Sequence, residues 1–210
     1  MAHIEDGNAN AVFMCSKEKK NIFLIGDSIR LGYCAEVKKE LSDIAEVFYL
    51  EDNCRNTQYV IPSLEFWKNM ISHPERIDVI HFNCGHWDVA HCHGSEFSLT
   101  SPEEYAQNIK VIIWLLKKLF VNAKIIFATT TPMNPNGIMG LNPRSNEEID
   151  NYNRLAVEVC KENGVEVNDL NSFARSWGSE YFADYCHFTP ETNKLLGKKV
   201  ADVLKSASNI

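Results

Sequence analysis

The sequence NIFLIGDSIRLGY, residues 21–33, decides the fold of this chain because its pattern changes in the middle. The apolar run 22–25 is typical of a strand buried on both faces. Gly26-Asp27-Ser28 ends that run, and a helical pattern begins at once. A strand that passes directly into a helix predicts the start of a βαβ unit. Ser28 stands at the turn, where a serine could cap the helix or act as a nucleophile.

The same alternation continues to the end of the chain. Apolar patterning predicts four more strands, at residues 45–50, 77–82, 124–128 and 165–167. Helices are predicted at residues 29–41, 59–71, from 101, at 146–163 and from 189, whereas 170–188 read as irregular. The alternation predicts right-handed crossovers and an α/β fold, a three-layer α/β/α sandwich on a five-stranded parallel sheet.

Two local signals refine this prediction. Ser101-Pro102-Glu103-Glu104 is a strong helix start, with a capping serine, a proline at the first helical position and a glutamate three residues after the serine. Pro62 is expected near the first turn of the helix at 59–71. Residues 1–20 are expected to form a loose extension or an added edge element, and residues 21–210 a single domain.

Composition excludes several function classes. The 210 residues are 45% hydrophobic and 23% charged, which is ordinary for a globular protein. The net charge is −7 and the cations are scattered, so no nucleic-acid partner is expected. No apolar run approaches the roughly 20 residues of a membrane span and no signal peptide is visible, so we expect a cytoplasmic protein without membrane contact. The seven cysteines form no C-x-x-C pair, which favours reduced thiols.

The chemistry is expected at one edge of the sheet, because ligands of such sheets bind outside the carboxyl ends of the strands. The segments expected there are residues 26–28, 51–57, 83–88 and 130–145. Far along the chain, Asp184-Tyr185-Cys186-His187 offers a base and an orienting carboxylate for a serine nucleophile. The order Ser, Asp, His is one of the known triad orders. The plainer interpretation is a surface aspartate and histidine in a loop.

With Gly26-Asp27-Ser28 near one end and Asp184-x-x-His187 before a Phe-Thr-Pro helix start near the other, the chain resembles the SGNH or GDSL hydrolases. The resemblance runs from about residue 21 to residue 204. It implies a flavodoxin-like fold and serine ester hydrolysis without a cofactor. It also implies Ser28 as the nucleophile, His187 as the base and Asp184 as the carboxylate that orients the base.

The middle of the chain departs from the common pattern of this family. The usual Gly-x-Asn-Asp block is replaced by Asn83-Cys84-Gly85-His86-Trp87-Asp88, which looks like a side branch with Asn-x-Gly-x-x-Asp. Trp87 then stands where the family has its oxyanion-hole asparagine, and Asn83 becomes the candidate amide donor.

The oxyanion hole would be completed by backbone groups. The N–H of Ser28 is one expected donor, and Cys54 or Arg55 would supply another, because the 51–57 loop has no glycine. Arg55 is also expected to pair with Asp52. Substrate contacts are expected at Asp27, Gly85 and Trp87.

Other chemistry is less well supported by the sequence. Residues 86–93 contain three histidines, a cysteine and an aspartate, but they lack a recognised metal-ligand spacing, so no metal is expected. Cys186 could be a nucleophile served by His187, although neighbouring side chains rarely face each other. No dinucleotide-binding or Walker A pattern is present, so no nucleotide cofactor is expected.

Two functions follow from these features. The first is a serine esterase that acts on a small-molecule ester, with a short acyl group such as acetyl on a carbohydrate or another small polar alcohol. The second is a non-catalytic module that binds a glycan or small ligand at the same edge, with Ser28 only capping a helix. The sequence leaves the oligomeric state open.

Overall fold

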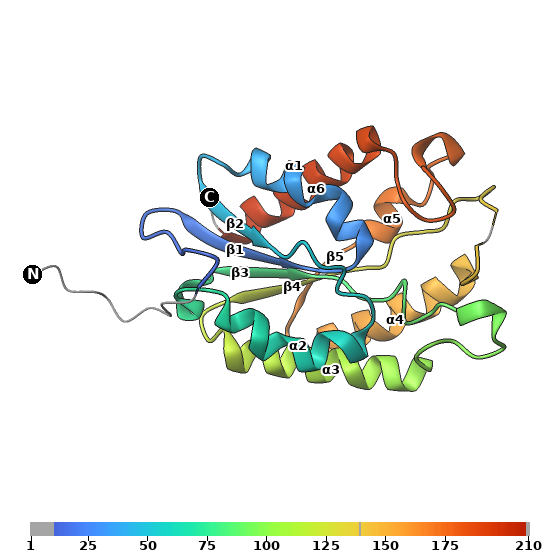
Figure 1. Cartoon of the computed structure of the whole chain (residues 1–210), viewed down its shortest axis with the longest axis horizontal. Coiled ribbons are helices and arrows are strands. Elements are labelled where there is room, and N and C mark those ends of the chain that lie inside the picture. Colours follow the sequence, from blue (N-terminus) through green and yellow to red (C-terminus); the bar gives the residue numbers. More distant parts are fainter. Residues whose placement is uncertain (1–10, 139, 209–210) are drawn as a thin grey trace, which may run out of the picture.

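A five-stranded parallel sheet runs through the centre of the computed structural model, which describes residues 11–138 and 140–208 (Figure 1). The strands are β1 (Lys20–Ile25), β2 (Ala45–Tyr49), β3 (Val79–Phe82), β4 (Lys124–Ala128) and β5 (Glu166–Asn168). Their order is β2-β1-β3-β4-β5, and all neighbouring pairs are parallel. This is the flavodoxin-like strand order, and it confirms the predicted α/β fold.

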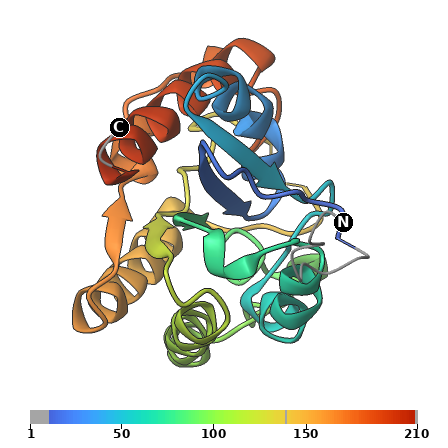
Figure 2. The ribbon, with the colours of Figure 1, turned by 90° about the vertical axis from the view of Figure 1, so that its left-hand side faces the viewer.

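Helices cover both faces of the sheet. One face carries α1 (Ser28–Glu40), α5 (Leu170–Ala174) and α6 (Pro190–Ser208), and the other carries α2 (Thr57–Asn69), α3 (Pro102–Leu119) and α4 (Asn146–Glu162) (Figures 1 and 2). Short 3-10 helices lie at Pro74–Arg76, Cys92–Gly94 and Ser179–Tyr181. The three predicted layers are therefore present.

Burial on both faces explains the apolar run of β1. The residues from Ile22 to Ile25 have no exposed surface. Phe23 and Ile25 pack into the apolar cluster shared with α2, α3 and α4, whereas Ile22 and Leu24 pack into the cluster shared with α1 and α6. Successive side chains of a strand point to opposite faces, so one short run contributes to both cores.

Some helix boundaries differ from the sequence-based expectation. α2 begins at Thr57, because the Asn56 side chain accepts a hydrogen bond from the backbone N–H of Tyr59 and so caps the helix earlier. Pro62 therefore lies in the second turn and not in the first. α5 falls in the segment predicted to be irregular, because five residues are too few to show a helical period. Ser101 caps α3 as predicted, accepting from the N–H of Glu104.

Residues 11–19 are attached to the domain. Phe13 forms an isolated parallel bridge with Ile71. Its ring lies 6.5 Å from that of Phe23 and 5.6 Å from that of Phe48, between centroids. The remainder of the predicted extension, residues 1–10, lies outside the described residues.

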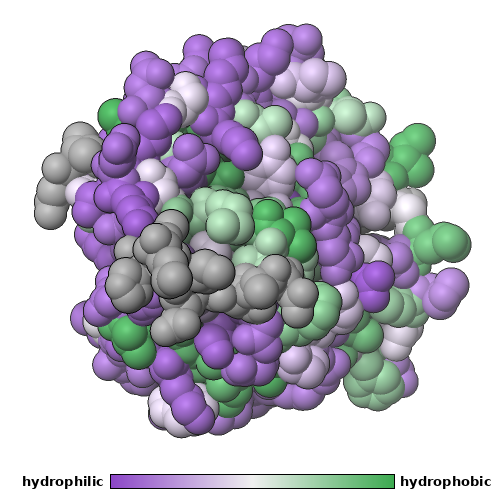
Figure 3. Space-filling model, turned by 60° about the vertical axis from the view of Figure 1, so that its left-hand side comes forward, coloured by the Kyte–Doolittle hydropathy of each residue, from purple (hydrophilic) through white to green (hydrophobic). Residues whose placement is uncertain are grey.

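Figure 3 shows a face on which hydrophilic residues dominate and apolar residues form small groups. In the part of the chain that the structure describes, no helix combines the length and the apolar character that crossing a membrane requires.

Replacing Phe23 by alanine should lower the free energy of unfolding by about 3–5 kcal/mol, because the ring is fully buried and its loss leaves a cavity. Urea denaturation of the wild type and the variant measures this difference. Phe66→Ala is the matched control, since the Phe66 side chain is 68% exposed and its loss should change stability by about 0.5 kcal/mol or less. Equal effects of the two substitutions would contradict the assignment of Phe23 to the core.

Candidate active site

Ser28, His187 and Asp184 form a continuous chain of contacts at the carboxyl edge of the sheet. Nε2 of His187 lies 2.8 Å from Oγ of Ser28, although the two residues are 159 positions apart. Nδ1 of the same ring lies 2.7 Å from Oδ2 of Asp184. The structure thus brings together the three residues that the sequence singled out, in the geometry of a nucleophile, a base and an orienting carboxylate.

Ser28 is the first residue of α1 and does not cap it. The cap is Asp27, whose Oδ1 accepts a hydrogen bond from the backbone N–H of Ile29. The interpretation of Ser28 as a helix cap is therefore wrong. With the capping position taken by its neighbour, the Ser28 hydroxyl is available to His187.

A tight turn presents the base. Oδ1 of Asp184 accepts hydrogen bonds from the backbone N–H groups of Cys186 (2.8 Å) and His187 (2.7 Å). Burial of the carboxyl opposes its ionisation, but these bonds and the imidazole outweigh that effect and lower the pKa of Asp184. The carboxylate is therefore charged and held in place from residues within the same turn.

Cys186 contacts the base directly. Its Sγ lies 3.6 Å from Nδ1 of His187, so the expectation that these neighbouring side chains do not face each other is wrong. The sulfur contacts Nδ1 of the ring, whereas Oγ of Ser28 contacts Nε2. The pKa of His187 is raised to about 9, first by Cys186 and then by Asp184, against the opposing effect of burial.

The structure corrects the expected oxyanion donors. The backbone N–H of Cys54 donates to the carbonyl of Gly26, and that of Arg55 donates to Oδ1 of Asn53. The amide of Asn83 donates to Oδ1 of Asp27. Sequence reasoning could not anticipate these acceptors, because those of Cys54 and Asn83 lie on the distant turn at residues 26–27. The acceptor of Arg55 is only two residues away, but Arg55 donates to it from a left-handed conformation (φ 48°).

Arg55 has a different neighbour from the one expected. Its guanidinium lies over the ring of Tyr59, 4.8 Å from the centroid. The hydroxyl of Tyr59 donates to Asp52 at 2.5 Å. The tyrosine therefore takes the carboxylate that Arg55 was expected to pair with.

A cavity of about 130 Å³ opens beside the serine and the histidine. Its lining residues are Ser28, Asn53, His86, Trp87, Asn142, Arg144, Tyr185, Cys186 and His187. Of the three expected substrate contacts, only Trp87 lines it. Asp27 is 1% exposed and caps α1. Gly85 is also buried, and a Cβ there would lie 2.0 Å from Oγ1 of Thr130, so this glycine serves close packing and not substrate contact.

Arg144 is the principal residue that sequence reasoning missed. It is 7% exposed, donates from Nη1 to the carbonyl of His86, and lies with Nη2 3.5 Å from Sγ of Cys186. A signal did exist, because Arg144 is the one basic residue of the 130–145 loop, which was placed at the ligand edge. Only the fold shows that its side chain turns into the cavity.

The histidine-rich stretch 86–93 is divided among separate partners. Nε2 of His86 contacts Oγ1 of Thr131 at 3.0 Å, and the buried Asp88 accepts from the N–H and hydroxyl of Thr57. Burial raises the pKa of Asp88 to about 6, and the bonds from Thr57 oppose that rise. These residues tie the loop after β3 to its neighbours and do not converge on one point.

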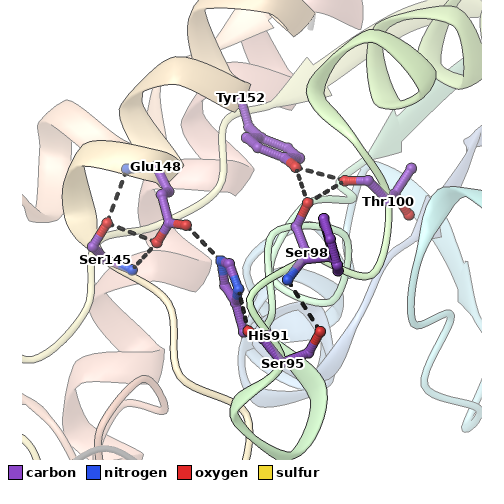
Figure 4. A network of polar contacts seen from close by, with 8 residues as sticks. His91, Ser95, Ser98, Thr100, Ser145, Glu148 and Tyr152 are labelled. Carbon is purple, nitrogen blue, oxygen red and sulfur yellow. Dashed lines mark hydrogen bonds and ion pairs between the residues drawn. The ribbon is translucent and has the colours of Figure 1, made fainter.

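His91 belongs to a polar network that joins the same loop to α4 (Figure 4). Its Nε2 lies 2.6 Å from Oε1 of Glu148, and its Nδ1 lies 2.8 Å from the carbonyl of Ser95. Glu148 also accepts from Ser145 in a capping box at the start of α4. The network holds the loop after β3 next to the loop that carries Arg144.

In the described part of the chain, the group with the proximity needed to hold a metal ion is Asp184, Cys186 and His187, whose ligand atoms lie within 4.8 Å of one another. All three already contact each other as parts of the turn, and Arg144 places a positive charge next to the sulfur. The arrangement fits a turn that orients the base better than a cation site.

A serine–histidine–aspartate arrangement at the strand ends of a flavodoxin-like sheet defines a class of serine-dependent hydrolases. A family comparison agrees with this class, since residues 62–195 match the GDSL-like Lipase/Acylhydrolase family. The chain therefore belongs to that family and is an esterase or acylhydrolase of the GDSL type. The matched region contains Asp184 and His187 and begins after Ser28.

Plant relatives carry the same family name. The chain is 27% identical over 184 residues to GDSL esterase/lipase WDL1 of Oryza sativa subsp. japonica, a match that covers 82% of this chain and 69% of the rice protein. It is 30% identical over 114 residues to GDSL esterase/lipase CPRD49 of Arabidopsis thaliana, covering 50% of this chain and 44% of that protein.

Solved structures share the fold at low sequence identity. A lipase/acylhydrolase from Enterococcus faecalis superposes with a TM-score of 0.70 at 19% identity, covering 89% of this chain and 96% of that one. The acetyl xylan esterase AlAXEase superposes with a TM-score of 0.69 at 17% identity, covering 88% and 99%. Est24, a carbohydrate acetylesterase from Sinorhizobium meliloti, gives 0.66 at 16% identity, covering 90% and 99%.

In an NMR titration, the His187 imidazole should be half-protonated near pH 9, and Cys186→Ala should move this midpoint to lower pH, because Cys186 is the largest influence that raises the pKa. Below the midpoint the ring holds a proton and cannot accept one from Ser28. Cys92→Ala, in the loop after β3, is the control and should leave the midpoint in place. An unchanged midpoint in Cys186→Ala would show that the sulfur does not set it.

Proposed function

We propose that the chain is a serine esterase that removes a short acyl group, such as acetyl, from a carbohydrate or another small polar alcohol. In this proposal Ser28 is the nucleophile, His187 is the base and Asp184 orients the base. The observation that carries it is the continuous chain of contacts, 2.8 Å from Ser28 Oγ to His187 Nε2 and 2.7 Å from His187 Nδ1 to Asp184 Oδ2.

The reaction would follow from this geometry. Nε2 of His187 takes the hydroxyl proton as Oγ of Ser28 attacks the ester carbonyl. The imidazolium formed is stabilised by the Asp184 carboxylate and then gives its proton to the leaving alcohol. The neutral ring then takes a proton from water, whose oxygen attacks the acyl carbon. The bond from that carbon to Oγ of Ser28 breaks, the acid leaves, and the ring returns the proton to Oγ.

The backbone N–H of Ser28 is the main oxyanion donor in this mechanism. It belongs to the first residue of α1, where a backbone N–H has no acceptor within the helix and the helix dipole favours negative charge. Asn83 is proposed as a positioning residue, since its amide donates a hydrogen bond to Asp27, the cap of α1.

We also propose that the chain belongs to a branch of the family that carries Asn-x-Gly-x-x-Asp in the block after β3. Here Asn83 braces the cap, Gly85 packs on Thr130 and Asp88 anchors α2.

The size of the cavity supports a short acyl group. Its volume of about 130 Å³ is well below the roughly 300–1,000 Å³ of pockets that hold drug-sized ligands. Two proteins of the same fold are described as an acetyl xylan esterase and a carbohydrate acetylesterase, which supports an acetyl ester of a sugar as the first substrate to test.

A non-catalytic binding module is the competing proposal. It requires Ser28 to act only as a helix cap, and Asp27 occupies that position. The contact between Ser28 and His187 also has no purpose in a module that merely binds. Both observations favour the esterase.

Ser28→Ala should reduce hydrolysis of p-nitrophenyl acetate to the background rate, and Asp184→Asn should reduce turnover by about 10⁴-fold, because the histidine loses its orienting partner. Ser206→Ala, at the exposed end of α6, is the control and should keep full activity. p-Nitrophenyl octanoate should be a poorer substrate than the acetate. Full activity in either active-site variant would exclude that residue from the mechanism. Negligible activity in the wild type at about pH 9 and above, where at least half of the His187 rings are neutral, would favour the binding module.

A further inference from the structure

The cavity beside Ser28 contains a buried cation that the proposed mechanism does not use. Arg144 is 7% exposed and lines the same cavity as Ser28 and His187. Burying a guanidinium is unfavourable unless it is paired or fully hydrogen-bonded. The partners of Arg144 therefore indicate whether its charge serves the fold or a ligand.

Those partners leave the charge uncompensated. Arg144 donates to one carbonyl, that of His86, and to the sulfur of Cys186, and it lies over the ring of Tyr185, 5.5 Å from the centroid. Its buried Nε has no hydrogen-bond partner. Among the residues that the structure describes, no carboxylate forms an ion pair with Arg144. Its charge does act on Asp27, but burial raises the pKa of that carboxyl and Arg144 donates no hydrogen bond to it.

Arg30 provides a comparison within the same chain. It is fully buried, pairs with no carboxylate among the described residues, and likewise has an Nε without a hydrogen-bond partner. However, it donates to three carbonyls, those of Leu50 (2.5 Å), Asp52 (2.6 Å) and Gly26 (3.1 Å). The donors of Arg30 thus hold the loop after β2 in place, and Arg30 does not line the cavity. Arg144 has one carbonyl where Arg30 has three, so donor capacity remains for a ligand.

The rest of the cavity is complementary to an anion. Within the described chain, none of its lining residues is acidic, although the whole chain carries a net charge of −7. Asn53 and Asn142 add amide groups to the lining. Burial, and then the charge of Arg144, lower the pKa of His86, so that ring is neutral and does not compete for the anion.

The position of Arg144 indicates which part of the ester substrate would carry the anionic group. In the proposed mechanism His187 protonates the leaving alcohol, so the alcohol part of the substrate must lie on the His187 side of Ser28. Nη2 of Arg144 lies 3.5 Å from Sγ of Cys186, which in turn contacts the His187 ring. Arg144 also lines one cavity with Ser28 and His187, so it lies on the His187 side of that cavity, where we place the alcohol part.

We propose that Arg144 is a specificity residue that binds a carboxylate on the alcohol part of the substrate, so that the natural ester is an acyl ester of a hydroxy acid, sugar acids included. This inference rests on the proposed esterase function and names its substrate class. The carboxylate would pair with the guanidinium, which suits this geometry because its planar donors match two carboxylate oxygens.

The test compares 3-acetoxybenzoate with 3-acetoxybenzamide, which differ mainly in charge. Each kcat/KM is divided by the rate constant for alkaline hydrolysis of the same ester, which removes differences in intrinsic reactivity. The wild type should prefer the carboxylate by about 10- to 100-fold, the factor expected for one charge-assisted hydrogen-bonded pair. Arg144→Gln should bring the ratio close to one, and Arg144→Lys should keep part of it.

Arg154→Gln is the matched control, because Arg154 lies exposed on α4 and pairs with Glu158, and it should keep the full ratio. A ratio near one in the wild type would overturn the proposal. So would an Arg144→Gln variant that loses activity on both esters equally, since Arg144 would then serve the fold or the oxyanion. If Arg144→Gln fails to fold, product inhibition of the wild type decides, because 3-hydroxybenzoate should inhibit at least tenfold more strongly than 3-hydroxybenzamide.

Binding to Ser28→Ala, measured by calorimetry, separates this proposal from the esterase proposal. 3-Acetoxybenzoate should bind this variant more tightly than 3-acetoxybenzamide. Tighter binding of the carboxylate without any hydrolysis by the wild type would refute the esterase and retain the anion site. Hydrolysis of both esters at equal normalised rates, with equal binding, would retain the esterase and refute the role of Arg144.

Discussion

The hydrogen bond from the backbone N–H of Ile29 to the buried carboxyl of Asp27 sets the geometry on which the site depends. It determines that α1 begins at Ser28, and it leaves the serine hydroxyl free for His187. Asn83, at the end of β3, donates to the same Asp27 oxygen. The neighbouring strand thus supports the capping carboxyl, and the direction of the nucleophile depends on the pairing of β1 with β3.

The loops around this point are held by polar contacts that reach from one strand end to the next. Arg30 of α1 binds carbonyls of the loop after β2, and Asp88 of the loop after β3 binds the first residue of α2. Arg144 binds the carbonyl of His86, and the network in Figure 4 joins His91 to Glu148. Each contact links two segments that are distant in sequence, so the loops form one surface around the cavity. These contacts hold the reacting groups in a fixed geometry, and such positioning lowers the activation barrier of an enzymatic reaction.

The turn that carries His187 and the oxyanion region differ in how far apart in the sequence their interacting residues lie. Asp184, Cys186 and His187 lie within four residues, and the carboxylate organises the turn through the backbone N–H groups of both later residues. A short motif can specify such a turn, which is why Asp184-x-x-His187 was recognisable in the sequence. The partners of the oxyanion region are mostly distant in sequence. The N–H of Cys54 and the amide of Asn83 donate to Gly26 and Asp27, whereas the N–H of Arg55 donates to Asn53 within its own loop.

The alternation of strands and long helices, the parallel sheet and the candidate triad residues could be predicted from the sequence alone, whereas the short α5 could not. Short apolar runs predict strands, and Ser101 followed by Pro102 predicts a helix start. The blocks around Ser28 and His187 indicate a candidate nucleophile and a candidate base. Only the tertiary structure decided which of Asp27 and Ser28 caps α1, where the donors near Ser28 are directed, and that Arg144 enters the cavity. The physical reason is that periodicity and capping depend on neighbours along the chain. Hydrogen-bond partners and the burial of a charge depend on groups that meet only when the strand ends are brought to one edge of the sheet.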